Sequence, residues 1–242
     1  MPGSHRLGLR PEPGAGVPLD AARVRLYRQG GAGGLCALAG AVELLRSGKA
    51  PLALVGGVDS FWDPDLLAGL GDEGRLQGDG PRDALIPGEG AAFLLLSTQG
   101  MAGREGRRPL ARVAEVGLAV EQGHRYSPAP LMGDGLTAAF QRLFAAVRGL
   151  PPVRSVYAGM NGESLPAKEW SVAYLRNAGR FASEHELLHA ADCIGDAGAA
   201  LGPIQLALAA QALSNGHHEA PCLVWSTSDR EARGAALLLA AG

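Results

Sequence analysis

The side chains that could bind a metal ion in this sequence are two histidines and a cysteine at regular spacing. His185, His189 and Cys193 follow one another at intervals of four residues. On a helix, this spacing would place three ligands along one face. On a strand, residues four apart stand roughly 13 Å from one another and could not hold one ion. The secondary structure of this segment therefore decides whether a metal site is expected.

Thiol chemistry is a second possibility, because the chain contains cysteine at positions 36, 193 and 222. Cys36 falls inside a helix-compatible run, and we interpret it as a small buried hydrophobic residue. Cys193 has Asp192 and Asp196 on either side in the sequence, and their carboxylates would disfavour a thiolate by like charge. A catalytic Cys193 stays open as the alternative.

Other polar residues offer acid, base or ligand-binding groups. Glu89 stands between two glycines and could act as an acid or a base. Asn161 and Glu163 could bind a ligand, and the alternative is that they belong to an ordinary polar loop at a strand end. His217 and His218 follow a glycine, and we interpret them as a solvated loop pair.

One stretch has the layout of a nucleophile elbow without a nucleophile. An extended run at 24–28 leads into the glycine-rich turn at 30–34, which opens a helix-compatible run at 36–45. A buried run containing Gly56-Gly57 comes next. A strand, a tight glycine turn and a helix present the reactive side chain at the turn in enzymes of this layout. The expected position here is Gly31, which has no side chain.

The elements that would position these residues alternate between apolar extended runs and helical stretches, which indicates a layered α/β fold. We expect strands near 23–28, 51–57, 90–97, 110–119, 153–158, 186–191, 221–226 and 234–240. We expect helices at 32–47, 133–149, 165–178 and 197–214, which start at Gly31, Asp134, Ser164 and Asp196. Because 186–191 is expected to be a strand, we expect no metal site at the histidine-cysteine series.

Composition and charge limit the classes of function that can be expected. The chain has 242 residues, of which 47% are hydrophobic and 19% charged, as in an ordinary globular protein. A net charge of −2 gives no electrostatic reason to expect nucleic acid or an anionic membrane as a partner. An odd number of cysteines without metal-ligand spacing favours reduced thiols in a cytoplasm. No apolar run approaches the roughly 20 residues that span a bilayer.

Five motifs in sequence order resemble the β-ketoacyl synthase branch of the thiolase-like superfamily, from about residue 22 to the C-terminus. They are 33–38 (Gly-Gly-Leu-Cys-Ala-Leu), 54–60 (Leu-Val-Gly-Gly-Val-Asp-Ser), Gly74-Arg75-Leu76 with the glycine-glutamate-glycine strand at 87–96, Ile194 to Gly202, and the closing segment Ser226 to Leu239. The resemblance implies an incomplete thiolase-like layered αβα fold with mixed sheets and central buried helices at 32–47 and 197–214. It also makes Gly56, Gly57, Gly88, Glu89, Gly90 and Gly195 structural, with the Glu89 carboxylate accepting backbone N–H bonds.

The same resemblance implies where reactive groups would lie. The family uses a cysteine to hold the acyl group and two histidines to assist decarboxylation and stabilise the developing negative charge. The cysteine position falls on Gly31, the first histidine near Gly159 and the second histidine on Asp196. The lysine upstream of the second histidine falls on Ala191, and the closing loop is replaced by residues 228–231. We therefore expect no confident catalytic residue, and Asn161, Glu163 and Asp196 become candidate ligand-binding residues.

These departures lead to expectations about organisation and function. Residues 1–18 are expected to form a loose arm, 19–120 the remainder of an N-terminal half, 121–134 a connecting loop and 135–242 a C-terminal half. Only 30 residues precede Gly31, far fewer than in the family, so we expect a homo-oligomer or a partner chain to cover a missing layer. We expect Trp62 and Trp170 to serve packing or an interface, and Arg23, Arg25 and Arg28 to face solvent or a partner.

The first hypothesis is a ketosynthase-like protein without catalytic activity, which acts as an acyl-binding, carrier-binding or assembly subunit in fatty acid or polyketide biosynthesis. The alternative is a divergent acyltransferase with a site rebuilt around Asp196, Cys193 or the pair Asn161 and Glu163. A fragment of a longer active protein is the third option. No cofactor is expected, and acyl carrier protein is the expected small partner.

Overall fold

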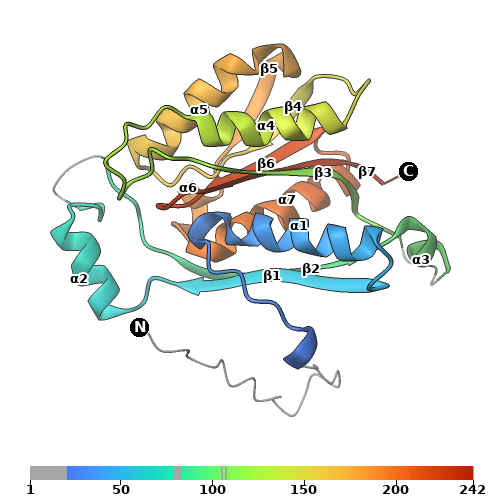
Figure 1. Ribbon diagram of the computed structural model, residues 1–242, viewed down its shortest axis with the longest axis horizontal. Helices are drawn as coiled ribbons and strands as arrows, with labels where there is room; N and C mark the ends of the chain where they lie inside the picture. The colour runs from blue at the N-terminus through green and yellow to red at the C-terminus, as the bar shows by residue number, and fades with distance from the viewer. Residues whose placement is uncertain (1–20, 79–82, 105, 107, 242) are drawn as a thin grey trace.

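The computed structural model describes residues 21–78, 83–104, 106 and 108–241. Its elements form stacked layers, and Figure 1 shows two helices between a small lower sheet and a larger upper sheet. The central helices are α1 (Gly33–Arg46) and α7 (Leu201–Ser214), which confirms the two helices expected at the centre. The layered fold with buried central helices is therefore confirmed.

The larger sheet is mixed and has the strand order β3-β7-β6-β4-β5. Its strands are β3 (Ala111–Val120), β4 (Val153–Tyr157), β5 (Phe181–Leu188), β6 (Cys222–Thr227) and β7 (Ala232–Ala240). β4 runs parallel to both β5 and β6, whereas β7 is antiparallel to β6 and β3. β3 precedes residues 121–133 and pairs with β7 near the C-terminus, so this sheet combines strands from distant parts of the sequence.

Two helices cover the outer face of this sheet, α4 (Asp134–Ala146) and α5 (Ser164–Arg176) (Figure 1). The buried side chains of α4 repeat at the spacing of one helix face: Leu136, Ala139, Phe140, Leu143 and Phe144. They pack with Trp170 and with the sheet residues Leu223, Trp225 and Leu237 to form one hydrophobic core.

A second core lies between the two sheets and is built from α1 and α7. Leu35, Leu38 and Leu206 contact sheet residues such as Val55 and Val224. A Cβ atom at Gly34 would lie 2.3 Å from Cδ of Pro203, so this glycine lets the two helices approach closely. A larger residue at position 34 would therefore push α1 and α7 apart.

The smaller sheet pairs β1 (Leu52–Ser60) with β2 (Glu89–Ser97) in antiparallel register, with Leu54 opposite Leu95 and Gly56 opposite Phe93. One face of this sheet packs against α1 and α7. Three short helices complete the described chain: α2 (Pro64–Asp72), α3 (Gln99–Arg104) and α6 (Ala191–Ile194). The sequence analysis missed all three, although Asp63 before Pro64 is a helix-start signal and its carboxylate caps α2.

Two expected strands differ from the structure. Residues 23–28 form no strand, since the 3₁₀ turn at Ala21–Arg23 leads into irregular chain. The strand expected at 186–191 is β5, which begins and ends earlier, and α6 starts at Ala191. Residues 121–133 contain no helix or strand, and the arm expected at 1–18 lies outside the described residues. Among the described residues, no helix is long and apolar enough to cross a membrane.

Candidate functional site

The three positions singled out by the sequence, Gly31, Gly159 and Asp196, line one cavity of about 440 Å³. They come from different elements. Gly31 lies in the turn before α1, Gly159 follows β4, and Asp196 lies between α6 and α7. Gly31 lies 128 positions before Gly159 and 165 positions before Asp196, and the three residues meet because α1 and α7 begin on the side of the core where β4 and β6 end.

The turn at Gly31 is held against the closing segment after β6. Ser226 Oγ donates a hydrogen bond to the carbonyl of Gly31 at 2.8 Å. Ser228 Oγ accepts from the backbone N–H of Ala32 at 3.0 Å and donates to the carbonyl of Gln29. A Cβ atom at Gly31 would lie 2.4 Å from the carbonyl oxygen of Thr227. The space that a side chain at position 31 needs is therefore occupied by backbone.

Gly159 is also closed by backbone. A Cβ atom there would lie 2.8 Å from both the carbonyl oxygen of Trp225 and Cα of Ser226. The preceding residue is fixed from two sides, because Ala158 N–H donates to Leu188 and Gln205 Nε2 donates to the Ala158 carbonyl at 2.6 Å. An imidazole at position 159 would require this part of the sheet to move.

Asp196 is the one of the three positions that carries a functional group. Its Oδ1 accepts the N–H of Gly198 at 2.8 Å, and its Oδ2 accepts Asn161 Nδ2 at the same distance. The carboxylate therefore accepts the N–H of the first residue of the 3₁₀ turn Gly198–Ala200, whose N-cap is Ala197, and it does not cap α7, which begins at Leu201. Burial raises the pKa of Asp196, and the nearby carboxylates of Glu163 and Asp229 raise it further, against the opposing effect of its two hydrogen bonds.

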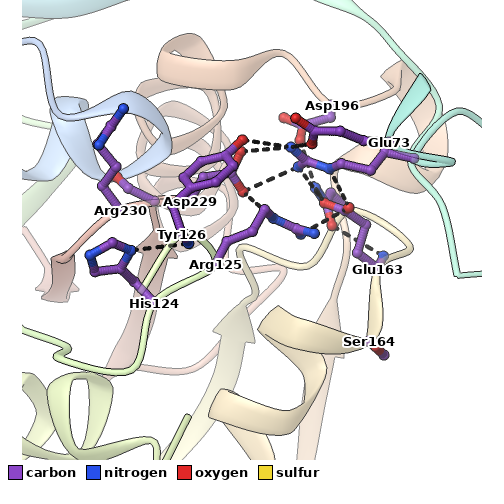
Figure 2. Close-up of polar contacts among 12 residues, drawn as sticks. Glu73, His124, Arg125, Tyr126, Glu163, Ser164, Asp196, Asp229 and Arg230 are labelled. Carbon is purple, nitrogen blue, oxygen red and sulfur yellow. Dashed lines mark hydrogen bonds and ion pairs between the residues drawn. The ribbon is translucent and has the colours of Figure 1, made fainter. Parts of the chain in front are cut away.

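A network of two arginines and two carboxylates closes one side of the cavity. Arg75 donates to Glu163 at 2.8 and 2.9 Å and to Asp229 at 2.9 and 3.1 Å. Arg125 contacts the same two carboxylates, each at 2.9 Å. Figure 2 shows Glu163, Arg125 and Asp229 pointing toward one another. Only 3% of the Glu163 side chain is exposed, so the two guanidinium groups, rather than water, are the partners of its carboxylate.

A second buried ion pair fixes the closing loop that carries Asp229. Arg233 and Glu169 are both completely buried, and Arg233 Nη2 donates to Glu169 Oε1 at 2.7 Å. Arg233 Nη1 also donates to the carbonyl of Ser228 at 2.8 Å. Because one guanidinium joins α5 to the loop, Asp229 and Ser228 are held in place.

The charge of the cavity is negative. The acidic residues along its wall are Asp59, Asp65, Glu73, Glu163, Asp196 and Asp229. Arg75 is the basic residue among the described residues that line it, and Arg125 adds a second positive charge behind Glu163 and Asp229. Asp59 is engaged as an acceptor for the N–H of Ala199. A carboxylate or phosphate ligand would meet like charge here.

The three thiols lie away from this cavity. Cys36 sits on α1 and is half-buried, and burial raises its pKa. Cys222 is buried on β6, and burial raises its pKa to about 12. Cys193 is exposed on α6 and does not line the cavity. A thiolate nucleophile at the cavity would require a residue that the described chain does not place there.

The histidine-cysteine series is spread over different elements. His185 lies on β5 and packs against the rings of Trp170, Tyr174 and Phe181. His189 follows β5 and contacts Asp192 at 3.4 Å. Within the part of the chain that the structure describes, no three His, Cys, Asp or Glu side chains form a metal-ligand group.

Several other expected roles change. Glu89 accepts from the hydroxyl of Ser60 at 2.9 Å, so its partner is a side chain rather than the expected backbone N–H. His218 is not solvated: it contacts Glu186 at 3.0 Å and packs near Tyr157. Trp62 is 87% exposed, so it does not belong to the core, whereas Trp170 stacks on Trp225 in the core.

The glycines expected to be structural lie at close backbone contacts. A Cβ atom at Gly88 would lie 2.4 Å from the Ile194 carbonyl, and one at Gly57 would lie 2.4 Å from the Ala199 carbonyl. Gly195 has φ 75°, which favours glycine. These contacts join β2 and β1 to the segment that carries Asp196.

Sequence reasoning missed Arg75, Arg125 and Asp229 as parts of the site. Arg75 and Asp229 stood inside segments that drew attention for other reasons, namely the Gly74-Arg75-Leu76 motif and the altered closing loop. No local sequence pattern predicts that Arg75 pairs with Glu163 and Asp229, because these partners are 88 and 154 residues away in the sequence.

Comparison with known proteins supports a ketosynthase-like chain. Residues 31–102 match the family model described as Beta-ketoacyl synthase, N-terminal domain. The ishigamide ketosynthase/chain length factor superposes with a TM-score of 0.77 at 18% identity, over 88% of this chain and 60% of that chain. A type II PKS acyl-carrier protein in complex with its ketosynthase bound to the hexaketide (AntDE:AntF) gives a TM-score of 0.81 at 18% identity, over 90% of this chain and 63% of that chain.

A modular enzyme gives the same result. The ketosynthase from module 6 of the bacillaene synthase from Bacillus subtilis 168 has a TM-score of 0.67 at 15% identity, over 88% of this chain and 46% of that chain. At these identities the likeness shows the fold, which confirms the expected thiolase-like architecture. The chain spans 60% of the length of the ishigamide protein that it matches.

Proposed function

We propose that this chain, which has the ketosynthase fold, is a subunit that binds acyl chains or an acyl carrier without condensing them. One observation carries the proposal. The cavity where the resemblance puts the family's reaction is lined by two glycines, Gly31 and Gly159, and the backbone of residues 225–227 occupies the space that side chains at these positions would need. The condensing reaction needs a thiol and imidazole donors at these places.

The electrostatics of the cavity support the same function. Decarboxylative condensation places an anionic substrate and a developing enolate in the site, and both need positive charge or N–H donors. Here the wall is rich in carboxylates, and its arginines are engaged by Glu163 and Asp229. A site that repels anions and has no thiol suits holding an uncharged acyl chain better than activating a malonyl-type group.

The partners follow from the same reasoning. The ketosynthases that share the fold include one in a complex with an acyl-carrier protein and one described with a chain length factor. We infer a comparable place for this chain in fatty acid or polyketide biosynthesis in the cytoplasm, where it assembles with a second copy or with a ketosynthase-type partner and contacts an acyl carrier.

Intact-mass spectrometry tests the absence of condensing chemistry. The purified chain is incubated with acyl-CoA and, separately, with acyl-loaded carrier protein. The expected spectrum shows the unmodified mass, while titration of the same acyl-carrier protein by calorimetry shows binding. A stoichiometric acyl adduct overturns the proposal, and so does the absence of binding to both the acyl group and the carrier.

A divergent acyltransferase is the second candidate, and one observation favours it. Asp196 has a raised pKa and shares Asn161 with Glu163, since Asn161 Nδ2 donates to both carboxylates at 2.8 and 3.0 Å. A carboxyl group of raised pKa beside a second carboxyl is a usable acid-base pair. Turnover of acyl thioesters that disappears in Asp196→Ala, with the fold retained by circular dichroism, would establish this function in place of the first.

A further inference from the structure

The carboxylates of the cavity outnumber the cations that face them. The two guanidinium groups beside the cavity, Arg75 and Arg125, are both bound to Glu163 and Asp229. Glu73 contacts the same Arg75 at 3.4 Å. Three acidic residues of the wall are left without a lysine or arginine partner among the described residues: Asp59, Asp65 and Asp196.

Two of these carboxylates, Asp59 and Asp196, lie side by side at the 3₁₀ turn before α7. Asp196 Oδ1 accepts the N–H of Gly198 at 2.8 Å, and Asp59 Oδ2 accepts the N–H of the next residue, Ala199, at the same distance. Their other hydrogen bonds come from an amide side chain and a backbone N–H, which are uncharged donors. Consecutive N–H groups therefore hold two negative charges on one wall of the cavity.

Burial makes these two charges costly. Asp59 and Asp196 are partly buried, whereas Asp65 is exposed, so water screens its charge. Burial raises the pKa of Asp196, and the carboxylates of Glu163 and Asp229 raise it further. A cation in the cavity would favour the charged form of Asp196 and remove this conflict. A ligand with a positive charge therefore gains most at Asp59 and Asp196.

Apolar side chains surround the pair of carboxylates. A Cβ atom at Gly198 would lie 2.3 Å from Asp59 Oδ2 and 3.3 Å from Cε2 of the Phe61 ring, so the ring and the carboxylate meet at this glycine. Aromatic rings are favourable neighbours of organic ammonium groups. The rest of the wall includes five leucines: Leu66, Leu70, Leu85, Leu165 and Leu201. The cavity thus combines a place for a positive charge with a surface for a hydrocarbon chain.

An organic cation fits these groups better than a metal ion. Calcium and magnesium ions take about six or more oxygen ligands, and the described residues contain no group of three His, Cys, Asp or Glu side chains that could hold a metal. A primary ammonium group has three N–H donors, which two carboxylates can accept. The cavity volume of about 440 Å³ falls within the range of small-molecule pockets, about 300–1,000 Å³.

We propose that this cavity selects acyl chains that end in a protonated amine, with Asp59 and Asp196 as the residues that determine the specificity. The inference rests on the proposed function, because it names the class of acyl chain that the same cavity binds. The ammonium group donates charge-assisted hydrogen bonds to the two carboxylates, while the hydrocarbon part of the chain lies against the leucines. A neutral chain end lacks these bonds and an anionic chain end meets like charge, so the selection uses both attraction and repulsion.

Calorimetric titration with three N-acetylcysteamine thioesters of similar length tests the selection. Their acyl groups are nonanoyl, ω-aminooctanoyl and ω-carboxyheptanoyl, whose chain ends are neutral, cationic and anionic at neutral pH. The ω-aminooctanoyl thioester should bind about tenfold tighter than the nonanoyl thioester, and the ω-carboxyheptanoyl thioester about tenfold weaker.

Variants of the two carboxylates test the assignment. Asp59→Asn and Asp196→Asn should each lower the ratio of the ω-aminooctanoyl affinity to the nonanoyl affinity, and the double variant should bring this ratio close to one. Asp192→Asn is the matched control, because it removes one negative charge from an exposed position on α6 that does not line the cavity. Its ratio should equal that of the parent chain.

The outcomes separate this inference from the proposed function. If the nonanoyl thioester binds and the ω-aminooctanoyl thioester binds no tighter, the selection is overturned and acyl binding stands. If none of the three thioesters binds, acyl binding and the selection are overturned together. A ratio that is unchanged in the double variant, or lowered equally by Asp192→Asn, overturns the assignment to Asp59 and Asp196. Circular dichroism establishes that each variant is folded, and the two single variants give the same comparison if the double variant is not.

Discussion

Restoring a cysteine at position 31 should damage the protein rather than revive a reaction. In Gly31→Cys the new Cβ atom would lie 2.4 Å from the Thr227 carbonyl oxygen, about 1 Å closer than an ordinary contact. Either the turn or the closing segment must move, and both are tied together by Ser226 and Ser228. Overpacking of this kind costs about 1–3 kcal/mol, and a hydrogen bond lost with the movement adds about 1 kcal/mol.

Urea unfolding measures this loss directly. We expect the free energy of unfolding of Gly31→Cys to fall by about 2–4 kcal/mol relative to the parent. Gly69→Cys is the matched control, because Gly69 lies on α2 at the same cavity and a Cβ atom there meets nothing within 4 Å. Its stability should change by less than about 0.5 kcal/mol.

The same variants also test the chemistry. Neither Gly31→Cys nor Gly69→Cys should form a thioester with acyl-CoA, because the described residues that line the cavity include no imidazole to stabilise the thiolate or the oxyanion. The reasoning fails if Gly31→Cys unfolds at the same urea concentration as the parent. That result would mean that the backbone at Thr227 yields without cost and that position 31 is open to a side chain.

Three further predictions concern the charges and thiols of the site. Arg75→Met should lower the free energy of unfolding by about 3 kcal/mol, because it removes one of the two guanidinium groups that pair with the buried Glu163 carboxylate. In the same urea assay, Arg46→Met at the surface should cost less than about 1 kcal/mol, and equal losses in the two variants would contradict a stabilising role of the Arg75 network. Burial raises the pKa of Asp196 above its unfolded value, so the penalty for its charge is absent below the unfolded pKa and complete above the folded pKa. In urea unfolding, the stability of Asp196→Asn relative to the parent should therefore increase as the pH rises above the unfolded pKa of about 4, and a difference that stays constant with pH would refute the assignment. A dithiobis-nitrobenzoate reagent should modify exposed Cys193 at neutral pH. Cys222 should react only after unfolding, because burial raises its pKa to about 12; rapid reaction of Cys222 in the folded protein would show that β6 is accessible to the reagent.

The sequence predicted most of the fold because its signals are local. The apolar spacing of α4, the glycine turn before α1 and the glycine-glutamate-glycine strand each reflect contacts within one or two elements. The strand expected at 23–28 was wrong, because a strand depends on hydrogen bonds to a neighbouring strand, and the sequence of one segment does not show whether such a neighbour exists.

The candidate site was predictable only in part. Asn161, Glu163 and Asp196 were singled out from their places in the sequence, and they do lie on one cavity. Their electrostatic partners were not found, because Arg75 and Arg125 carry no pattern that distinguishes them from solvated arginines. The network along the cavity wall forms only because the fold brings Arg75 within hydrogen-bonding distance of Glu163 and Asp229.

The sequence by itself determined the order of elements, the buried central helices and the absence of side chains at positions 31 and 159. Only the tertiary structure decided that the backbone of residues 225–227 fills the space beside both glycines. It also decided that Arg75 pairs with Glu163 and Asp229, which lie 88 and 154 positions away in the sequence. The physical reason is range. Helix and strand periodicity are set by neighbours along the chain, whereas steric closure and ion pairing depend on distances that exist only after the sheets and helices have packed.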